Sequence, residues 1–142
     1  FLSRNLPPPF GYNTKSQQDW VIMRYADVLL MLAEAENELN GPTELVYKSI
    51  NAIRKRALMP ELPPKLSKEQ MRNKIRNERR IELAFEGHRY FDLKRWRTAI
   101  SVLNAVADAP VTYKFEKKHY LWPIPQSEID KNKGKLVQNP DW

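Results

Sequence analysis

The stretch that decides the fold is residues 20–42, which read WVIMRYADVLLMLAEAENELNGP. Its apolar residues recur every three or four positions, the spacing that places side chains on one face of a helix. That face is formed by Ile22, Ala26, Leu29, Leu30 and Ala33, flanked by Tyr25 and Leu32. The opposite side carries Arg24, Asp27, Glu34 and Glu38. Since glycine followed by proline is the usual order at a helix end, we predict an amphipathic helix that begins at Trp20 and ends before Gly41.

Two more helices are predicted downstream. The second covers residues 43–57, with Thr43 as its N-cap, and its core side chains are Val46, Ile50, Ile53 and Ala57. Because the connection between the first two helices is very short, they should pack antiparallel. The third helix should begin at Lys68, since residues 67–70 read SKEQ and fit the capping box. It should run to about Glu86 and end at Gly87.

The rest of the chain flanks these helices. Residues 1–19 should form an irregular lead-in, because the prolines at positions 7–9 force an extended backbone. Residues 20–109 are predicted to be helical, with a fourth helical stretch over residues 88–107 that is bent or broken. Residues 110–142 should form a tail of extended pieces and loops, with a short helix capped by Ser127 and ending at Asp130. We expect residues 1–142 to form one mostly α-helical domain, whose successive helix pairs resemble the unit of an α-solenoid.

The composition excludes several classes of protein. The 142 residues carry a net charge of +7 and no cysteine, so disulfides, thiol nucleophiles and thiolate metal sites are ruled out. No apolar run is long enough to span a bilayer. The chain begins with Phe1 rather than with Met, so we expect it to be a fragment of a longer protein.

The third helix carries acids inside its apolar arc. Glu78 and Glu82 project from the middle of that arc, and Glu86 lies at its edge. One interpretation is a carboxylate pair for acid–base chemistry, as in glycosidases. The other is a network of structural ion pairs with Arg54, Arg56, Arg89 and Arg95, whose planar guanidinium groups suit buried carboxylates. We favour the structural network, because such pairs readily imitate functional carboxylates and nothing indicates an opposed pair across a cleft.

Other site chemistries have little support in the sequence. His88 and His119 are the only histidines, and neither belongs to a metal-binding motif. There is no GxSxG nucleophile motif and no glycine-rich phosphate loop. We therefore predict no catalytic residue, no metal and no cofactor.

Basic residues gather on one flank of the third helix and shortly after it. They are Arg72, Arg76, Arg79 and Arg80, followed by Lys94, Arg95 and Arg97. Because acids are interspersed and no nucleic-acid-binding motif is present, we interpret this flank as a solvated or ion-paired helix face. No nucleic acid is predicted as a partner.

The tryptophans are the remaining candidates for ligand contacts. Trp20, Trp96, Trp122 and Trp142 could act as stacking platforms for sugars, or they could fill the core and seal the loops. Core packing is favoured for each one taken singly. The weak candidates for ligand binding are Trp20, Trp96 and Trp122.

Five blocks resemble, in order, the C-terminal region of the SusD/RagB family. Residues 24–35 (RYADVLLMLAEA) and 50–57 (INAIRKRA) resemble the family's RyAEvlLmyAEA and IN-x-IR-x-RA. Residues 78–89 (ERRIELAFEGHR) and 91–96 (FDLKRW) are similar to its ERR-x-ELAFEG-x-R and fDLkRW. Residues 120–140 contain YLWPIP, then EI and QNP, as in the family's ending. The departures are Asp27 for the usual Glu, Leu58 for a frequent Gly, and Asp141-Trp142 for Gly-aromatic.

The resemblance implies a mostly α-helical fold of tetratricopeptide-like helix pairs with short extended C-terminal segments. It also implies a lipoprotein on the outward-facing surface of the outer membrane, anchored by an N-terminal lipid that this chain lacks. Such proteins are not enzymes. They work with a SusC-type TonB-dependent transporter in the uptake of oligosaccharides or, in some relatives, peptides. The matched blocks look architectural, so this segment is expected to be mainly helical scaffold and partner-contact surface, and no ligand residue is carried over.

Two other hypotheses remain open. The chain could be a free-standing helical-repeat module that binds a peptide or protein. It could also be a carboxylate-dependent glycosidase, which ranks last. A lipoprotein signal and several hundred further residues upstream would favour the glycan-binding hypothesis.

Overall fold

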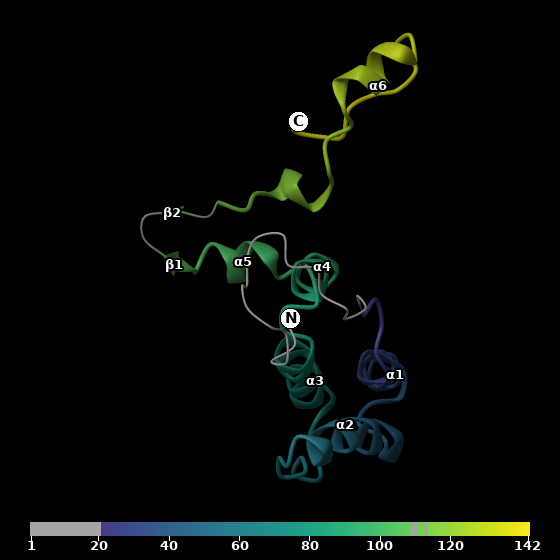
Figure 1. The fold of residues 1–142 in the computed structure, drawn as a ribbon, viewed down its shortest axis with the longest axis vertical. Coiled ribbons are helices and arrows are strands. Elements are labelled where there is room, and N and C mark those ends of the chain that lie inside the picture. The colour runs from purple at the N-terminus through teal and green to yellow at the C-terminus, as the bar shows by residue number, and fades with distance from the viewer. Residues whose placement is uncertain (1–20, 109–110, 113) are drawn as a thin grey trace, which may run out of the picture. The chain divides into compact units, whose positions relative to one another are not determined.

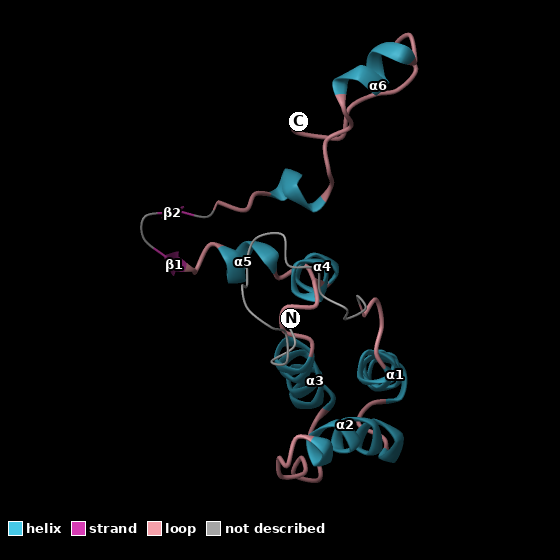
Figure 2. Ribbon diagram, in the orientation of Figure 1, coloured by secondary structure: helices cyan, strands magenta, loops and turns pink. Residues whose placement is uncertain are grey.

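The computed structural model describes residues 21–108, 111–112 and 114–142, and Figure 1 traces them in chain order. The contacts within the chain divide it into two compact units, residues 1–82 (the first unit) and residues 83–142 (the second unit). Helices dominate the described residues, which confirms the predicted fold class (Figure 2). That residues 1–142 form one domain stays a prediction.

In the first unit, the described residues form three helices: α1 (Tyr25–Asn40), α2 (Glu44–Arg56) and α3 (Lys68–Glu82). α1 packs against both α2 and α3 (Figure 1). The core of this unit consists of Ala33, Val46, Ile50, Leu62, Met71 and Ile75. At its edge, the Tyr47 hydroxyl accepts a hydrogen bond of 3.0 Å from the Leu66 N–H. This bond fixes the connection between α2 and α3 against the core.

The ends of α1 differ in part from the prediction. The helix ends at Gly41 as expected: the Gly41 N–H donates to the Asn37 carbonyl at 3.0 Å, and its positive φ of 83° turns the following chain away from the helix. It begins at Tyr25 and not at Trp20, which lies outside the described residues. Arg24 has an extended backbone, with φ −121° and ψ 156°, and its side chain binds the end of α3. A tertiary contact therefore sets the start of α1.

The caps of α2 and α3 use their predicted residues in different ways. The capping box of α3 is confirmed, because the Ser67 N–H donates to Gln70 Oε1 at 2.8 Å and the Gln70 N–H donates to Ser67 Oγ at 3.2 Å. Thr43 occupies the N-cap position of α2, but its side chain makes no cap bond. Its hydroxyl donates to the Glu36 carboxylate at 2.9 Å, since an ionised oxygen is a stronger acceptor.

The predicted end of α3 at Glu86 is wrong, because the helix ends at Glu82. Phe85 has a left-handed backbone with φ 65°, a conformation that does not continue a right-handed helix. Gly87 is also left-handed, and it lies at the N-cap of the next helix rather than at the end of α3.

The buried face of α1 also differs from the face predicted by the spacing of its apolar residues. Ala26, Leu30 and Ala33 are buried as predicted, but Ile22 is 84% exposed because it precedes the helix. The polar residues Asp27 and Asn37 are buried in its place. Exposed apolar side chains of α1 are Tyr25, Val28, Met31, Leu32 and Leu39. Ala57, predicted in the core stripe of α2, is exposed at the C-cap.

The second unit is built from short elements. Its helices are α4 (His88–Arg95), α5 (Ala99–Leu103), the 3₁₀ helix η1 (Lys117–Tyr120) and α6 (Gln126–Lys131). The strands β1 (Ala107–Asp108) and β2 (Val111–Thr112) pair antiparallel, with Ala107 opposite Thr112. A small core of Leu93, Ala99 and Phe115 connects α4, α5 and the segment that leads into η1.

The predicted break within the fourth helical stretch is present between α4 and α5. Arg97 has a left-handed φ of 58°, and the Thr98 N–H donates to the Leu93 carbonyl at 3.0 Å. This pattern is the Schellman cap, which satisfies carbonyls at the end of a helix. It is usually formed with glycine, so the motif is hard to recognise from an arginine.

Side-chain amides hold the C-terminal tail. Gln138 brackets Ile124, accepting from its N–H at 2.8 Å and donating to its carbonyl at 2.9 Å. The Asn139 side chain donates to the Trp122 carbonyl at 2.6 Å. These two bonds satisfy the backbone N–H and carbonyl of Ile124. This residue lies between two prolines and therefore has no regular β-sheet hydrogen bonds.

The predicted cap of the short C-terminal helix is wrong. Pro125, not Ser127, holds the N-cap position of α6, and its carbonyl accepts from the Glu128 N–H at 2.9 Å. Ser127 lies inside the helix. Tyr120, predicted to be extended, belongs to η1. Proline suits this boundary because the ring fixes φ while the carbonyl stays available to the following turn.

Candidate functional site

The first set of candidate residues is the group of carboxylates on α3. Glu78 is buried and accepts a hydrogen bond of 2.8 Å from Arg54 Nη1. Arg54 Nε also donates to the Pro60 carbonyl at 2.7 Å. The pair thus joins α2, the loop after it and α3.

Glu82 binds two arginines. Arg24 Nη1 donates to its Oε1 at 2.8 Å, and Arg24 Nη2 donates to its backbone carbonyl at 2.8 Å. Arg56 Nη2 donates to both carboxylate oxygens, at 2.7 and 2.6 Å. One acid at the end of α3 therefore ties down the start of α1 and the end of α2. The sequence did not indicate Arg24 as a member of this group.

The other members proposed from the sequence lie in the second unit. Arg95 forms an ion pair of 2.9 Å with Asp92, one turn away on α4. Glu86 and Arg89 are half-buried. Their membership in a network with Glu78 and Glu82 stays a prediction.

A further buried pair joins Asp27, which the sequence placed opposite the apolar face, to Arg79, which it placed on a solvated or ion-paired flank. Arg79 Nη1 donates to Asp27 Oδ1 at 2.8 Å, and each residue is only 4% exposed. The assignment of Asp27 to the polar side of its helix is wrong, whereas Arg79 is ion-paired, which is one of the two alternatives predicted for its flank. Asp27 adjoins Ala26, and Arg79 adjoins Glu78, so each lies at the edge of a buried stripe. A helical wheel cannot show the partner on the other helix, which alone makes burial of each charge tolerable.

Within the described residues, no group of three or more His, Asp and Glu side chains could hold a metal ion. No described helix has both the length and the apolar character needed to cross a bilayer.

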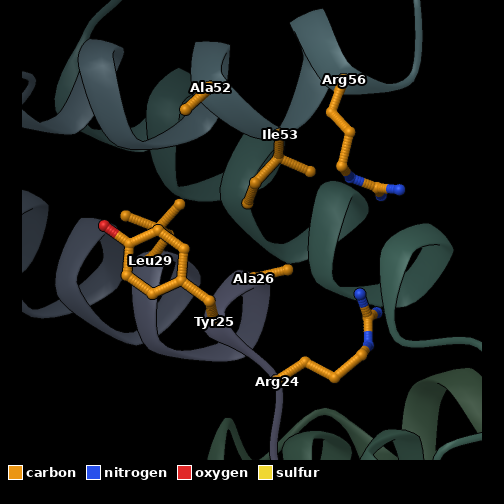
Figure 3. A pocket seen from close by; sticks show the side chains of 7 residues that line it. All are labelled: Arg24, Tyr25, Ala26, Leu29, Ala52, Ile53 and Arg56. Carbon is orange, nitrogen blue, oxygen red and sulfur yellow. The ribbon is translucent and has the colours of Figure 1, made fainter.

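A pocket of about 300 Å³ opens between the start of α1 and the end of α2 (Figure 3). Its floor is apolar and includes Ala26, Leu29 and Ile53. Arg24 and Arg56 line its rim, and both guanidinium groups are bound to Glu82. The pocket therefore offers a mostly apolar surface, to which Tyr25 adds a phenol side chain.

The second unit contains a cluster of aromatic rings, which we call the ring cluster: Tyr90, Phe115, His119, Tyr120, Trp122 and Trp142. Tyr90 lies between Phe115 and Trp122, with centroid distances of 6.3 and 6.0 Å. His119 bridges Phe115 and Trp142 at 5.4 Å from each. Most of these pairs are edge-to-face, the arrangement that the ring quadrupoles favour.

Five rings of the cluster, all but Tyr120, line an open cavity of about 240 Å³. Its lining is Tyr90, Lys114, Phe115, His119, Leu121, Trp122 and Trp142. Trp122 is 65% exposed and Trp142 is 44% exposed. Large rings that remain this accessible at a cavity are available to a ligand.

Ammonium groups lie over these rings. Lys94 Nζ is 5.2 Å from the Tyr90 centroid and 5.0 Å from the Trp122 centroid, and Lys118 Nζ is 4.9 Å from that of Trp142. Lys114 bonds the Glu116 carboxylate at 2.7 Å. This bond raises the pKa of Lys114 and lowers the pKa of Glu116. Both groups are therefore charged over a wide range of pH.

The predicted tryptophan platforms have different surroundings. Trp20 lies outside the described residues. Trp96 is half-buried, with the Arg95 guanidinium 4.9 Å from its ring centroid. Trp122 lines the cavity together with Trp142, which was not among the weak candidates. The signal that could have pointed to Trp142 is its position at the end of the matched QNP block.

The sequence model of the SusD family matches residues 5–142. The chain belongs to the SusD family. SusD-like protein P2 of Formosa agariphila is 32% identical over 90% of this chain and 27% of its own length. SusD-like protein P25 of the same organism is 36% identical over 79% of this chain and 22% of its own length. This SusD-family chain thus spans about a quarter of the length of these relatives.

Solved structures of SusD-like proteins have the same fold. A SusD homolog of Bacteroides thetaiotaomicron is 37% identical, with a TM-score of 0.77 over 97% of this chain and 30% of the homolog. Surface glycan-binding protein A of the same species is 39% identical, with a TM-score of 0.68 over 85% of this chain and 24% of that protein. The recognition of the SusD/RagB family from the sequence blocks is confirmed.

Proposed function

We propose that this chain is part of a cell-surface glycan-binding protein, in which it serves mainly as helical scaffold and partner-contact surface. The observation that carries the proposal is the match to surface glycan-binding protein A, at 39% identity over 85% of this chain. Family membership over residues 5–142 supports it.

The scaffold role is supported by where the buried charges lie. Asp27, Arg54, Glu78, Arg79 and Glu82 all fall within the blocks that resemble the family. Each of these side chains forms an ion pair that connects two helices, and none of them lines the pocket between α1 and α2 or the cavity of the ring cluster. Residues of this kind fix geometry, and the proposed protein is accordingly a binding protein and not an enzyme.

The proposed partner is a SusC-type TonB-dependent transporter at the outer membrane, and the full-length protein would be lipid-anchored on the outward-facing surface. The exposed apolar side chains of α1, among them Tyr25, Met31 and Leu32, support a contact role. Apolar surface of this kind is covered in a working assembly, by the rest of the protein or by a partner.

Native affinity electrophoresis of the full-length protein over a panel of polysaccharides tests glycan binding. We expect at least one polysaccharide to retard it, relative to the same gel without polysaccharide. Equal mobility over every polysaccharide would contradict the proposal and favour a peptide- or protein-binding helical module.

Copurification from detergent-solubilised outer membranes tests the transporter. We expect a tagged full-length protein to retain a TonB-dependent transporter through washing, and a variant without the lipidated cysteine to be released from the membrane fraction. Recovery of the tagged protein without any transporter would contradict the proposed partnership.

A further inference from the structure

We propose that the cavity of the ring cluster binds an anionic sugar residue, one that bears a carboxylate or a sulfate. The inference rests on the proposed function and adds a ligand class and a site within this chain. It is carried by the coincidence of exposed aromatic rings, a concave surface and an excess of cations in the second unit.

The cavity is built from separate segments of the chain. Tyr90 comes from α4, His119 from η1 and Trp142 from the end of the tail, while Phe115 and Trp122 come from the loops on either side of η1. At about 240 Å³, it lies just below the range of about 300–1,000 Å³ that holds drug-sized ligands. A single sugar residue is smaller than such ligands, so the size suits one ring of an oligosaccharide.

Backbone hydrogen bonds hold the lining rings in place. Asn104 brackets Phe115, accepting from its N–H at 2.6 Å and donating to its carbonyl at 3.0 Å. Trp142 Nε1 donates to the Lys118 carbonyl at 3.1 Å. His119 Nδ1 accepts from the Glu116 N–H at 2.8 Å, which places the ring proton of neutral His119 on Nε2. Because these side chains are already held in place, ligand binding costs little conformational entropy at this site.

The exposure of the tryptophans distinguishes this cavity from a packed core. Trp122 and Trp142 keep 65% and 44% of their surface accessible, whereas Phe115 in the same cluster is 8% exposed. Phe115 thus supports the cavity, and the tryptophans present apolar surface to an occupant. The C–H surface of a pyranose can pack on such rings while its hydroxyl groups stay in water.

The charged side chains around the rings favour a sugar that carries a negative charge. The Lys114 side chain lines the pocket, and the ammonium groups of Lys94 and Lys118 lie over the lining rings of Trp122 and Trp142. Glu116 pairs with Lys114 at 2.7 Å and lies 3.9 Å from Lys118. Among these described residues, the three lysines outnumber Glu116 and Asp141, which is next to Trp142 in the chain. A carboxylate or sulfate on the sugar would therefore gain charge-assisted hydrogen bonds that a neutral sugar lacks.

Titration of the full-length protein by isothermal calorimetry tests the inference. The probes are oligogalacturonate for a carboxylate, oligosaccharides of dextran sulfate for a sulfate, and neutral dextran oligosaccharides as reference. We expect one anionic probe to bind more tightly than dextran, and Trp122→Ala or Lys94→Gln to weaken it about tenfold. Binding should also weaken between 50 mM and 500 mM NaCl, because salt screens surface charges.

Matched variants separate the cavity from general effects. Phe85→Ala removes an exposed ring and Lys135→Gln an exposed ammonium group, and neither residue lines the cavity. Both should bind like wild type, and Lys94→Arg should keep most of the affinity. Thermal melting of each variant checks that it is folded, and because the Trp122 side chain is exposed, we expect its removal to leave the fold intact.

The failures are distinguishable. If wild type binds glycans but Trp122→Ala and Lys94→Gln bind them as tightly, the inference is overturned and the proposed function stands. Equal affinity for dextran and both anionic probes overturns the anionic specificity. If wild type binds neither these probes nor any polysaccharide of the panel, the proposed function fails and the inference fails with it.

Discussion

The two units of this chain use their charges in opposite ways. In the first unit, Asp27, Glu78 and Glu82 each form an ion pair with an arginine of another helix, so these charges stabilise the packing of the helices. In the second unit, Lys94 and Lys118 lie over exposed rings, and among the described residues Glu116 pairs with Lys114 and lies near Lys118. The difference shows that a basic chain can have an internally neutralised scaffold and still present a positive surface.

The largest effect is expected from Arg79→Ala. The substitution leaves Asp27 buried without its 2.8 Å partner, and it should lower the free energy of unfolding by about 3–5 kcal/mol. Urea denaturation followed by far-ultraviolet circular dichroism measures it. Arg80→Ala, at the exposed neighbouring position, is the control and should change stability little. Equal stability of the two variants would show that the Asp27 pair does not hold α1 to α3.

A smaller loss is expected from Glu82→Ala. It releases Arg24 and Arg56 together, and because these arginines reach solvent they can be rehydrated. We expect the free energy of unfolding to fall by about 2–3 kcal/mol. Glu61→Ala, in an exposed loop position, should change it little. A Glu82 variant that unfolds at the same urea concentration as wild type would contradict a structural role for this acid.

In the second unit, Gln138→Ala should act only locally. The substitution removes two hydrogen bonds between the Gln138 side chain and the Ile124 backbone. We therefore expect amide exchange at Ile124 to become faster, by a factor that corresponds to a loss of about 1 kcal/mol in local opening free energy. Hydrogen exchange followed by mass spectrometry measures it, with Gln126→Ala as control. Amide exchange in α1 and α3 should be the same as in wild type. A global loss of stability would mean that the tail supports more than its own loop.

The smallest effect concerns the surface pair of Glu38 and Arg72. A hydrogen bond from Arg72 lowers the pKa of Glu38 below its usual 4.5. The pair therefore stabilises the fold above pH 4.5, and this contribution is lost as the pH falls through the lowered pKa. Arg72→Gln should be slightly less stable than wild type at pH 7, and the difference should vanish at pH 2 and shrink in 1 M NaCl. A difference that persists at pH 2 would rule out the charge pair as its cause.

The fold was largely predictable, and the candidate site only in part. Apolar periodicity and the SKEQ capping box placed α1, α2 and α3, because those signals are local. The acids of α3 were correctly singled out as unusual, since they interrupt an apolar arc. The Arg24 contact, the Asp27–Arg79 pair and the grouping of Trp122 with Trp142 were missed, because each depends on residues far apart in the chain.

By itself, the sequence determined the helical class, the family and the stretches that form the helices of the first unit. These follow from residue spacing and from motifs that are read within a few turns of backbone. Only the tertiary structure decided where α1 begins, which charges are buried, and that rings from several segments line one open cavity. The physical reason is that the cost of burying a charge or exposing a ring depends on the partner supplied by another element, and a linear pattern does not contain that partner.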